Sequence, residues 1–255
     1  MENSFDIKTI QHNYPCNIDK FNEEFVYKSC NKEWIVVLQK LPDTITNEVR
    51  SDVKNKLYAK FRANKLIVVD IIYKFDNNRT INQIENSVYS NKIIVYKKGN
   101  IVSANFDENL NKVCAPGIHY FKSLEAAFYY EIPNDHNGLQ KIWYDNGQLY
   151  QELIFKDGKY DGLQKEWYKN GQLYQEITYK DEKKDGLNRK WFENGKLYQE
   201  ITWKNGKYND LCRTWYENEQ LSQEIMYTNG IQNGLFKCWS ENGILIYNGI
   251  VKKYK

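Results

Sequence analysis

The sequence predicts a mainly β protein in which a small α+β domain precedes an extended antiparallel meander of β-hairpins. Three observations lead to this fold class. All four prolines lie before residue 136, twelve of the fourteen glycines lie after it, and the second part of the chain repeats every 24 residues. A fixed period of this length is the signature of a repeat architecture. We therefore divide the chain into a domain at 1–131, a junction at 132–136 and an array at 137–255.

The array consists of five copies that align on one tryptophan and one leucine each. The copies are NGLQKIWYDNGQLYQELIFKDGKY (137–160), DGLQKEWYKNGQLYQEITYKDEKK (161–184), DGLNRKWFENGKLYQEITWKNGKY (185–208), NDLCRTWYENEQLSQEIMYTNGIQ (209–232) and NGLFKCWSENGILIYNGIVKKYK (233–255). The two constant columns are Trp143, Trp167, Trp191, Trp215 and Trp239, and Leu149, Leu173, Leu197, Leu221 and Leu245. We expect these ten side chains to form the structural core of the repeat.

Each copy has the pattern of two short strands around an Asn-Gly turn. Apolar and polar residues alternate over about six residues on each side of the turn, which is strand length. A two-residue loop would place Trp143 and Leu149 on opposite faces of the hairpin. A three-residue loop that ends on a left-handed glycine pairs Trp143 with Leu149 and Leu139 with Leu153. We expect the three-residue loop, because it gathers the apolar side chains on one face.

This register assigns the strand residues of each copy to two faces. One face is expected to carry Leu139, Trp143, Leu149, Leu153 and Phe155, and the other Gln140, Tyr144, Tyr150 and Glu152. Glu152 then faces Gln140, and Glu200 faces Asn188. In the fourth copy Glu219 replaces the turn glycine, which predicts a strained or altered turn. The last copy ends in Lys252-Lys253-Tyr254-Lys255, and such basic residues would discourage pairing at an exposed edge.

The N-terminal domain mixes strand signals with one helix signal. The apolar runs at 34–38 and 66–73 are typical of buried strands, and 117–121 is a further strand. Residues 92–96 and 101–106 flank Lys98-Gly99-Asn100 and predict a hairpin. Ser123 is placed to cap a short helix that runs to about Tyr130. These elements indicate an α+β domain of mostly antiparallel strands.

Charge and cysteine spacing limit the classes of partner and site. The net charge is +3 and the pI is near 8.4, so long-range attraction to nucleic acid or anionic lipid is weak. Five cysteines are widely spaced without a Cys-x-x-Cys pair, which favours reduced thiols, no metal site and no cofactor. No secretory core begins the chain, and no stretch approaches the ~18 to 20 apolar residues of a membrane span. We expect a cytoplasmic protein.

The pattern G-L-x-x-x-W-Y-x-N-G-x-L-x-x-E-x-x-Y-x-x-G at 137–255 resembles the MORN repeat variant, which is found in bacterial and giant-virus proteins. The resemblance implies a β-hairpin array used for binding or scaffolding, and it supplies no catalytic residue. The stretch DENLNKVCAPGIHYFKSLEAAFYY at 107–130, with KLYAKFRANKLIVVDI at 56–71, resembles an uncharacterised module that precedes repeats in giant-virus proteins. It implies a viral origin, with the host cytoplasm or the virion as location.

Two hypotheses of enzymatic activity in the N-terminal domain depend on few residues. The segment from Gly117 to Phe121, followed by Ser123, resembles the strand–helix element of ADP-ribosyltransferases, which would place His119 and Tyr120 near a nicotinamide. The rest of that family's pattern, an upstream partner for the ribose and a catalytic glutamate, is absent. A strand-to-helix packing corner explains the same residues. Cys114 and His119 could also form a nucleophile pair, although a structural thiol is the commoner role.

Two columns of the array are candidate binding surfaces. Tyrosine combines a large ring with a hydrogen-bonding tip and is enriched at interfaces. The aromatic stripes are Tyr144, Tyr150, Tyr168, Tyr174, Phe192, Tyr198 and Tyr216; ordinary cross-strand pairing would also explain them. The cation column is Lys141, Lys165, Arg189, Arg213 and Lys237, and either stacking on the tryptophans or an anionic partner would account for it.

Repetition of one surface suits binding better than chemistry. We expect a non-enzymatic scaffold that binds a protein partner through the hairpin array, with self-association also compatible with its uncovered apolar face. The alternatives are an ADP-ribosyltransferase-like enzyme in the N-terminal domain, targeted by the repeats, and attachment of the repeats to acidic lipid. The low net charge weakens the lipid alternative.

Overall fold

The computed structural model describes residues 25–88, 92–133 and 136–251 and consists almost entirely of strands, with one short helix. Two compact units divide it. One joins the N-terminal region up to Pro133 with Ile142–Gln148, and the other joins Asn134–Lys141 with Leu149–Lys255. The first hairpin turn of the array therefore belongs to the N-terminal unit. Residues 134–135 of the expected junction and the basic tail at 252–255 lie outside the described residues.

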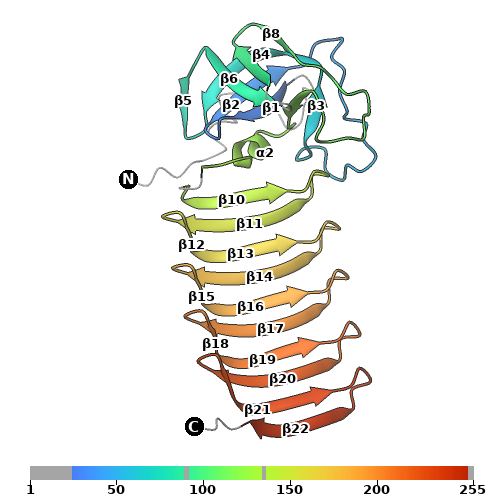
Figure 1. Ribbon diagram of the computed structural model, residues 1–255, viewed down its shortest axis with the longest axis vertical. Helices are drawn as coiled ribbons and strands as arrows, with labels where there is room; N and C mark the ends of the chain where they lie inside the picture. Colours follow the sequence, from blue (N-terminus) through green and yellow to red (C-terminus); the bar gives the residue numbers. More distant parts are fainter. Residues whose placement is uncertain (1–24, 89–91, 134–135, 252–255) are drawn as a thin grey trace. The chain divides into compact units, whose positions relative to one another are not determined.

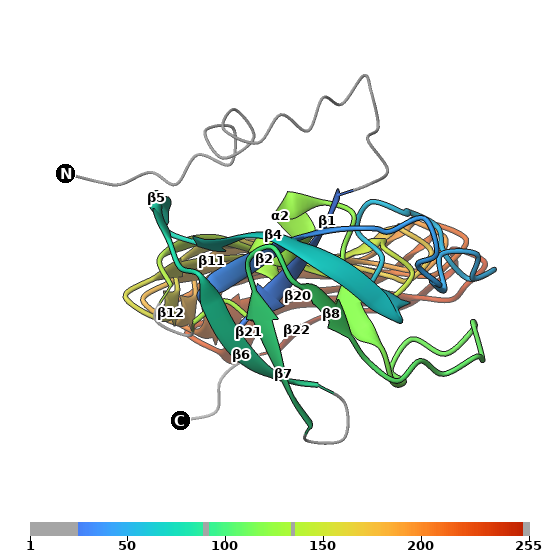
Figure 2. The same cartoon turned by 90° about the horizontal axis from the view of Figure 1, so that it is seen from above.

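Antiparallel strands form the N-terminal unit. Its main sheet has the order β1-β2-β4-β5, with β8 also paired to β4, and two-stranded pairs join β3 to β9 and β6 to β7; Figure 2 looks down on these strands. The elements are β1 (Phe25–Cys30), β2 (Trp34–Gln39), β3 (Phe61–Ala63), β4 (Lys65–Tyr73), β5 (Asp76–Thr80), β6 (Gln83–Val88), β7 (Lys92–Lys97), β8 (Ile101–Ser103), β9 (Ile118–Tyr120) and α2 (Leu124–Tyr129).

The predicted strands at 34–38, 66–73 and 117–121 are confirmed as β2, β4 and β9. The predicted helix is confirmed as α2, where the Ser123 side chain accepts a hydrogen bond from the Ala126 backbone N–H. The hairpin expected at 92–106 is wrong, because β7 pairs with β6 and β8 pairs with β4. The turn at Lys98–Asn100 thus links two different strand pairs instead of closing one.

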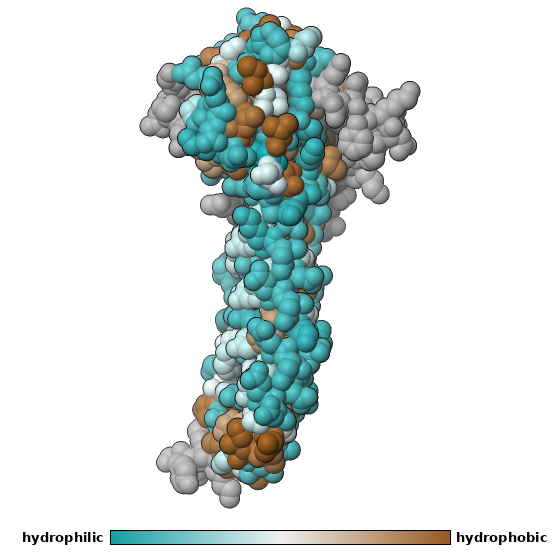
Figure 3. All heavy atoms as spheres, turned by 90° about the vertical axis from the view of Figure 1, so that its right-hand side faces the viewer, coloured by the Kyte–Doolittle hydropathy of each residue, from teal (hydrophilic) through white to brown (hydrophobic). Residues whose placement is uncertain are grey.

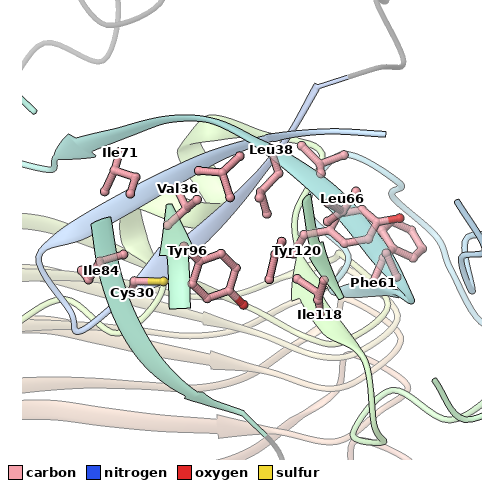
Figure 4. Packing of buried hydrophobic residues seen from close by; sticks show 14 of the residues in the cluster. Cys30, Val36, Leu38, Phe61, Leu66, Ile71, Ile84, Tyr96, Ile118 and Tyr120 are labelled. Atoms are coloured by element: carbon pink, nitrogen blue, oxygen red, sulfur yellow. The ribbon is translucent and has the colours of Figure 1, made fainter. Parts of the chain in front are cut away.

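The apolar faces of these strands form a filled core. Figure 4 shows Cys30, Val36, Leu38, Phe61, Tyr96 and Tyr120 among the side chains that pack together there. A second cluster, around Tyr27, Ile35 and Phe128, lies where α2 packs against β1. The side chains of Phe61, Tyr96 and Tyr120 are completely buried. The unit therefore gains its stability from burial of apolar surface.

The charged residues Arg62 and Lys74 are also completely buried, and hydrogen bonds to neighbouring oxygen atoms satisfy them. The Arg62 guanidinium donates to the carbonyl oxygens of Lys112, Asp107, Pro116 and Asn109, at 3.0, 3.2, 2.8 and 2.9 Å. It thereby holds the loop between β8 and β9 in place. The Lys74 ammonium donates to Ser29 Oγ and to the Tyr130 carbonyl, both at 2.8 Å. Burial lowers the pKa of Lys74 to about 7.

The first hairpin turn is enclosed within the N-terminal unit. The backbone N–H groups of Lys54 and Asn55 donate to the Asn146 carbonyl at 2.9 and 3.0 Å, and Arg50 donates to the Asp145 carbonyl at 2.7 Å. The Tyr58 ring stacks on Trp143 with centroids 4.9 Å apart. These contacts explain why a turn that repeats four more times along the chain is buried here and exposed in the later copies.

A 13-stranded sheet forms the array, and Figure 1 shows its hairpins following one another in sequence order. Ten strands lie on the main path, and the short strands β12, β15 and β18 pair beside it. The strands are β10 (Gly138–Trp143), β11 (Leu149–Lys156), β12 (Lys159–Tyr160), β13 (Gly162–Trp167), β14 (Leu173–Lys180), β15 (Lys183–Lys184), β16 (Gly186–Trp191), β17 (Leu197–Lys204), β18 (Lys207–Tyr208), β19 (Asp210–Trp215), β20 (Leu221–Thr228), β21 (Ile231–Trp239) and β22 (Leu245–Val251).

The three-residue loop within each copy is confirmed. In the second copy the Gly171 N–H donates to the Tyr168 carbonyl, the Tyr168 N–H donates to the Gln172 carbonyl, and Trp167 pairs with Leu173. Glu219 takes a left-handed φ of +70° with the same two hydrogen bonds, from its own N–H and from that of Tyr216. The fourth copy thus keeps the turn and accepts the backbone strain.

A β-bulge in the second to fifth copies makes the expected register beyond their Trp–Leu pairs wrong. The register shifts by one residue between Glu166 and Trp167, so that Leu163 pairs with Thr178 and Gln164 with Ile177. The third, fourth and fifth copies shift at the equivalent position. Because the extra residue moves the remainder of the second strand to the opposite face, the pairing expected between Leu139 and Leu153 does not occur at the equivalent positions of these copies.

Successive copies are joined by two-residue turns that the sequence analysis did not identify. Asp157-Gly158, Asp181-Glu182, Asn205-Gly206 and Asn229-Gly230 all have positive φ at both residues, the geometry of a type I′ turn. Next to these turns, buried side-chain amides form hydrogen bonds to the backbone of the neighbouring strand, where backbone-to-backbone pairing is interrupted. The Gln164 amide bonds both the N–H and the carbonyl of Ile154, at 2.8 and 3.0 Å, and Asn188 accepts from the Thr178 N–H at 3.1 Å.

Candidate functional site

The observed register defines two faces of the array. We call the face of Trp167, Leu173, Lys165, Glu176, Leu163 and Thr178, with their equivalents, the tryptophan face. The tyrosine face carries Tyr174, Glu166, Gln175, Gln164, Ile177 and Tyr179 with their equivalents; the assignment follows from the pairing and from the alternation of strand side chains. Ile177 and Tyr179, with their equivalents, therefore lie on the tyrosine face. The expectation that Leu153 and Phe155, at the same positions of the first copy, share a face with the tryptophans is wrong for these later copies.

The tryptophan face carries a ladder of ion pairs. Lys165 pairs with Glu176 at 3.4 Å, Arg189 with Glu200 at 3.0 Å, and Arg213 with Glu224 at 2.9 Å; Lys141 lies 3.8 Å from Glu152. The pairing expected between Glu200 and Asn188 is wrong, because the bulge places Arg189 opposite Glu200. The first four cations of the column thus lie next to a glutamate of the neighbouring strand.

The predicted aromatic stripes lie at the turn end of the tyrosine face. The rings of Tyr168 and Tyr174, and those of Phe192 and Tyr198, have centroids 5.0 Å apart. Most of the stripe is half-buried, and Tyr198 is 40% exposed. Burial, followed by the neighbouring Glu166 carboxylate, raises the pKa of Tyr150.

Tyrosines at the turn also connect consecutive copies. The Tyr168 hydroxyl donates to the Trp191 carbonyl, and the Tyr216 hydroxyl donates to the Trp239 carbonyl, both at 2.9 Å. Phe192 occupies the equivalent position of the third copy without a hydroxyl and cannot make this bond. These tyrosines therefore use their hydroxyl groups for hydrogen bonds within the sheet.

The opposite end of the tyrosine face holds a second aromatic surface that the sequence analysis missed. Its two groups of neighbouring rings are Phe155, Tyr160 and Tyr179, and Trp203, Tyr208 and Tyr227, with successive centroids 4.3–5.4 Å apart. Ile177, Asn188, Lys190, Ile201 and Trp203 line a shallow hollow between the groups. The Lys184 Nζ lies 4.7 Å from the centre of the Trp203 ring. The aromatic residues six positions after each of the first four repeat leucines were the available signal.

The N-terminal candidates are placed within the domain core or its loops. Tyr120 has no exposed surface, and its hydroxyl donates to Glu48 Oε1 at 2.5 Å. His119 Nε2 lies 3.2 Å from the Val113 carbonyl oxygen. Burial, followed by the nearby Lys60 and Lys28, lowers the pKa of His119 to about 3. In this conformation Tyr120 is not available to a ligand.

The remaining candidate chemistry concerns thiols and metals. Cys30, Cys114, Cys212 and Cys238 are free thiols, and Cys16 lies outside the described residues. Burial raises the pKa of Cys30 to about 11. Within 25–88, 92–133 and 136–251, no three His, Cys, Asp or Glu side chains gather as a metal ion would require. Nor does any helix in these ranges have the length and apolar character of a membrane span.

Comparison with known proteins identifies two parts of the chain. Residues 13–127 match a family of unknown function, DUF5758, and residues 137–157, 160–181, 184–205 and 211–229 match the MORN repeat variant. The chain is also 36% identical over 113 residues to "Uncharacterized protein L223" of Acanthamoeba polyphaga mimivirus, an alignment that covers 43% of this chain and 69% of that protein. The chain therefore belongs to the same family as this giant-virus protein and combines a DUF5758 region with MORN repeat variants.

Proposed function

We propose that the hairpin array is a scaffold that binds a protein partner through its tyrosine face. The observation that carries this proposal is the composition of that face, where aromatic rings and isoleucines recur in every copy from the second to the fourth. Large rings with polar tips, next to aliphatic side chains, are typical of the central part of protein interfaces.

The charges on the array favour a protein over nucleic acid or lipid. A phosphate-bearing partner requires unneutralised cations, whereas Lys165, Arg189 and Arg213 each pair with a glutamate of the adjacent strand on the tryptophan face. The tyrosine face itself carries both signs, for example Glu166 and Lys190 at equivalent positions. This mixed pattern suits recognition of a protein surface with its own mixture of charged and apolar groups.

A matched pair of variants of the full-length chain tests the proposal. Tyr198 on the tyrosine face and Leu187 on the tryptophan face are each 40% exposed. Wild-type chain, Tyr198→Lys and Leu187→Lys would serve as baits for affinity purification from expressing cells. We expect proteins enriched by the wild type and by Leu187→Lys to be lost with Tyr198→Lys. Enrichment of no protein above background, or loss with Leu187→Lys alone, would contradict the proposal.

A further inference from the structure

The last strand of the array differs from its predecessors in what it exposes. Among the described strands, β22 ends the sheet with β21 as its single neighbour. Ile244, Leu245, Ile246, Tyr247 and Ile250 at this edge are 67, 47, 67, 46 and 70% exposed. Figure 3 shows apolar side chains gathered at this end of the array. Unprotected apolar edges are rare in soluble proteins because they pair with other strands.

The earlier copies show that this apolar character is specific to the last one. Tyr247 stands where all four preceding copies have glutamine, and Asn248 where all four have glutamate. The segment Leu245–Val251 contains no charged residue, whereas β11, β14, β17 and β20 each contain at least one. Strand β22 itself therefore lacks the charges that would discourage pairing, and the basic residues that follow it lie outside the described residues.

We propose that β22 is a homodimer interface, in which the strands of two copies pair antiparallel about a two-fold axis through Asn248. β22 has seven residues, so full overlap with a second copy places the middle residue, Asn248, opposite itself. Ile246 then lies opposite Ile250 of the other copy, and Leu245 opposite Val251. Each such pair joins residues on the same face of the continued sheet.

The residue on the axis argues for a second copy as the occupant. A glutamate at position 248, as in the earlier copies, would place two carboxylates directly opposite each other, which is destabilising. The neutral Asn248 amide can both donate to and accept from its counterpart. Tyr247 would lie opposite Gly249 of the other copy. The strand is thus complementary to itself, and antiparallel pairing continues the pattern of the whole sheet.

Substitution of the axis residue tests the proposal in the full-length chain. Asn248→Glu restores the residue of the earlier copies and places it opposite Lys237 within the hairpin, so the fold should be kept. We expect the wild type to sediment as a dimer at micromolar concentration, and Asn248→Glu to raise the dimer dissociation constant about tenfold or more. A monomeric wild type at these concentrations, or an Asn248→Glu dimer of unchanged affinity, would overturn the proposal.

Two further comparisons test the surface and the register. Ile246 and Ile93, the latter in β7, are both 67% exposed, so Ile246→Glu should dissociate the dimer and Ile93→Glu should not. Only a residue on the axis lies opposite itself. Mixing Asn248→Glu chains with Asn248→Lys chains should therefore give a mixed dimer of higher affinity than either variant forms alone. Failure of this rescue, or dissociation by Ile93→Glu, counts against the proposed pairing.

Discussion

The N-terminal unit and the array use the same antiparallel strands but are stabilised in different ways. The N-terminal unit packs a contiguous core of completely buried side chains, including the buried Arg62 and Lys74. From Leu149 to Val251, the buried residues are Gln164, Ile177, Asn188, Ile201 and Cys212, two in each of the second and third copies and one in the fourth. The N-terminal unit therefore depends on a few irreplaceable contacts, whereas the array distributes its stability over many equivalent ones.

The hairpin turn shows this contrast within a single motif. Gly147 and Gly195 have φ values of +85° and +84°, so the same local geometry forms in both units. A Cβ on Gly147 would collide with the backbone of Asn55 and Ala59, while one on Gly195 would meet the flexible end of Gln172. The turn geometry is therefore local, and the cost of changing it depends on what surrounds it.

The largest effect is expected at the buried arginine. Arg62→Met would leave four backbone carbonyls of the 106–117 loop without their donor, at a cost of about 3–5 kcal/mol in the free energy of unfolding. Arg213→Met in the array should cost about 1 kcal/mol or less, because its pair with Glu224 is partly exposed. Urea unfolding of both variants checks the difference. Equal losses would show that the two units are not stabilised differently.

A smaller effect is expected at the enclosed turn. Gly147→Ala combines left-handed strain with a backbone collision, so we expect about 3 kcal/mol of destabilisation. Gly195→Ala carries only the strain, about 1 kcal/mol. Thermal unfolding measures both, and the natural Glu219 at the equivalent position supports the lower value for exposed turns. A Gly147→Ala variant as stable as Gly195→Ala would contradict the enclosed arrangement.

The buried lysine predicts how stability depends on pH. The pKa of Lys74 is about 7 when folded and has an ordinary value of 10.5, so between these values the unfolded chain binds more protons. The free energy of unfolding should then rise with pH, by up to about 1.4 kcal/mol per pH unit. This rise is expected between pH 7 and 9. Above pH 9 the buried Cys30 thiol, whose pKa is raised to about 11, changes the free energy of unfolding in the opposite direction.

Unfolding of the wild type and of Lys74→Met at pH 7, 8 and 9 measures this slope. The free energy of unfolding of Lys74→Met should rise clearly less with pH than that of the wild type. The rise that remains comes from Lys28, whose pKa burial also lowers. Lys156→Met, at the exposed end of β11, should leave the slope in place. Identical slopes for the wild type and Lys74→Met would contradict the assignment.

The smallest effect is expected in the ion-pair ladder. Glu200 pairs with Arg189 at 3.0 Å and lies 3.9 Å from Arg213. Because these side chains are partly exposed, Glu200→Gln should cost about 0.5–1 kcal/mol, and salt should reduce the difference. Unfolding at low and high ionic strength checks both points. A loss of several kcal/mol would place the ladder among the irreplaceable contacts.

The sequence was sufficient for the repeat, the three-residue turn and the strands with strong apolar runs. It did not reveal the bulge, because a single extra residue leaves the alternation on each side intact. The opposite charges of Lys165 and Glu176 were the available signal, since they meet only in the shifted register. In the N-terminal unit, β6 (QIENSV) has little apolar periodicity, so its pairing with β7 depends on tertiary contacts and could not be anticipated.

The assignment of the binding surface to one face can be tested most directly by site-specific crosslinking. A photoreactive phenylalanine analogue would replace Tyr198 or Leu187, two equally exposed positions on opposite faces, in the full-length chain. We expect the analogue at 198 to crosslink a partner protein and the analogue at 187 to give only background. Crosslinks from 187 in the absence of crosslinks from 198 would place the partner on the tryptophan face and contradict this account.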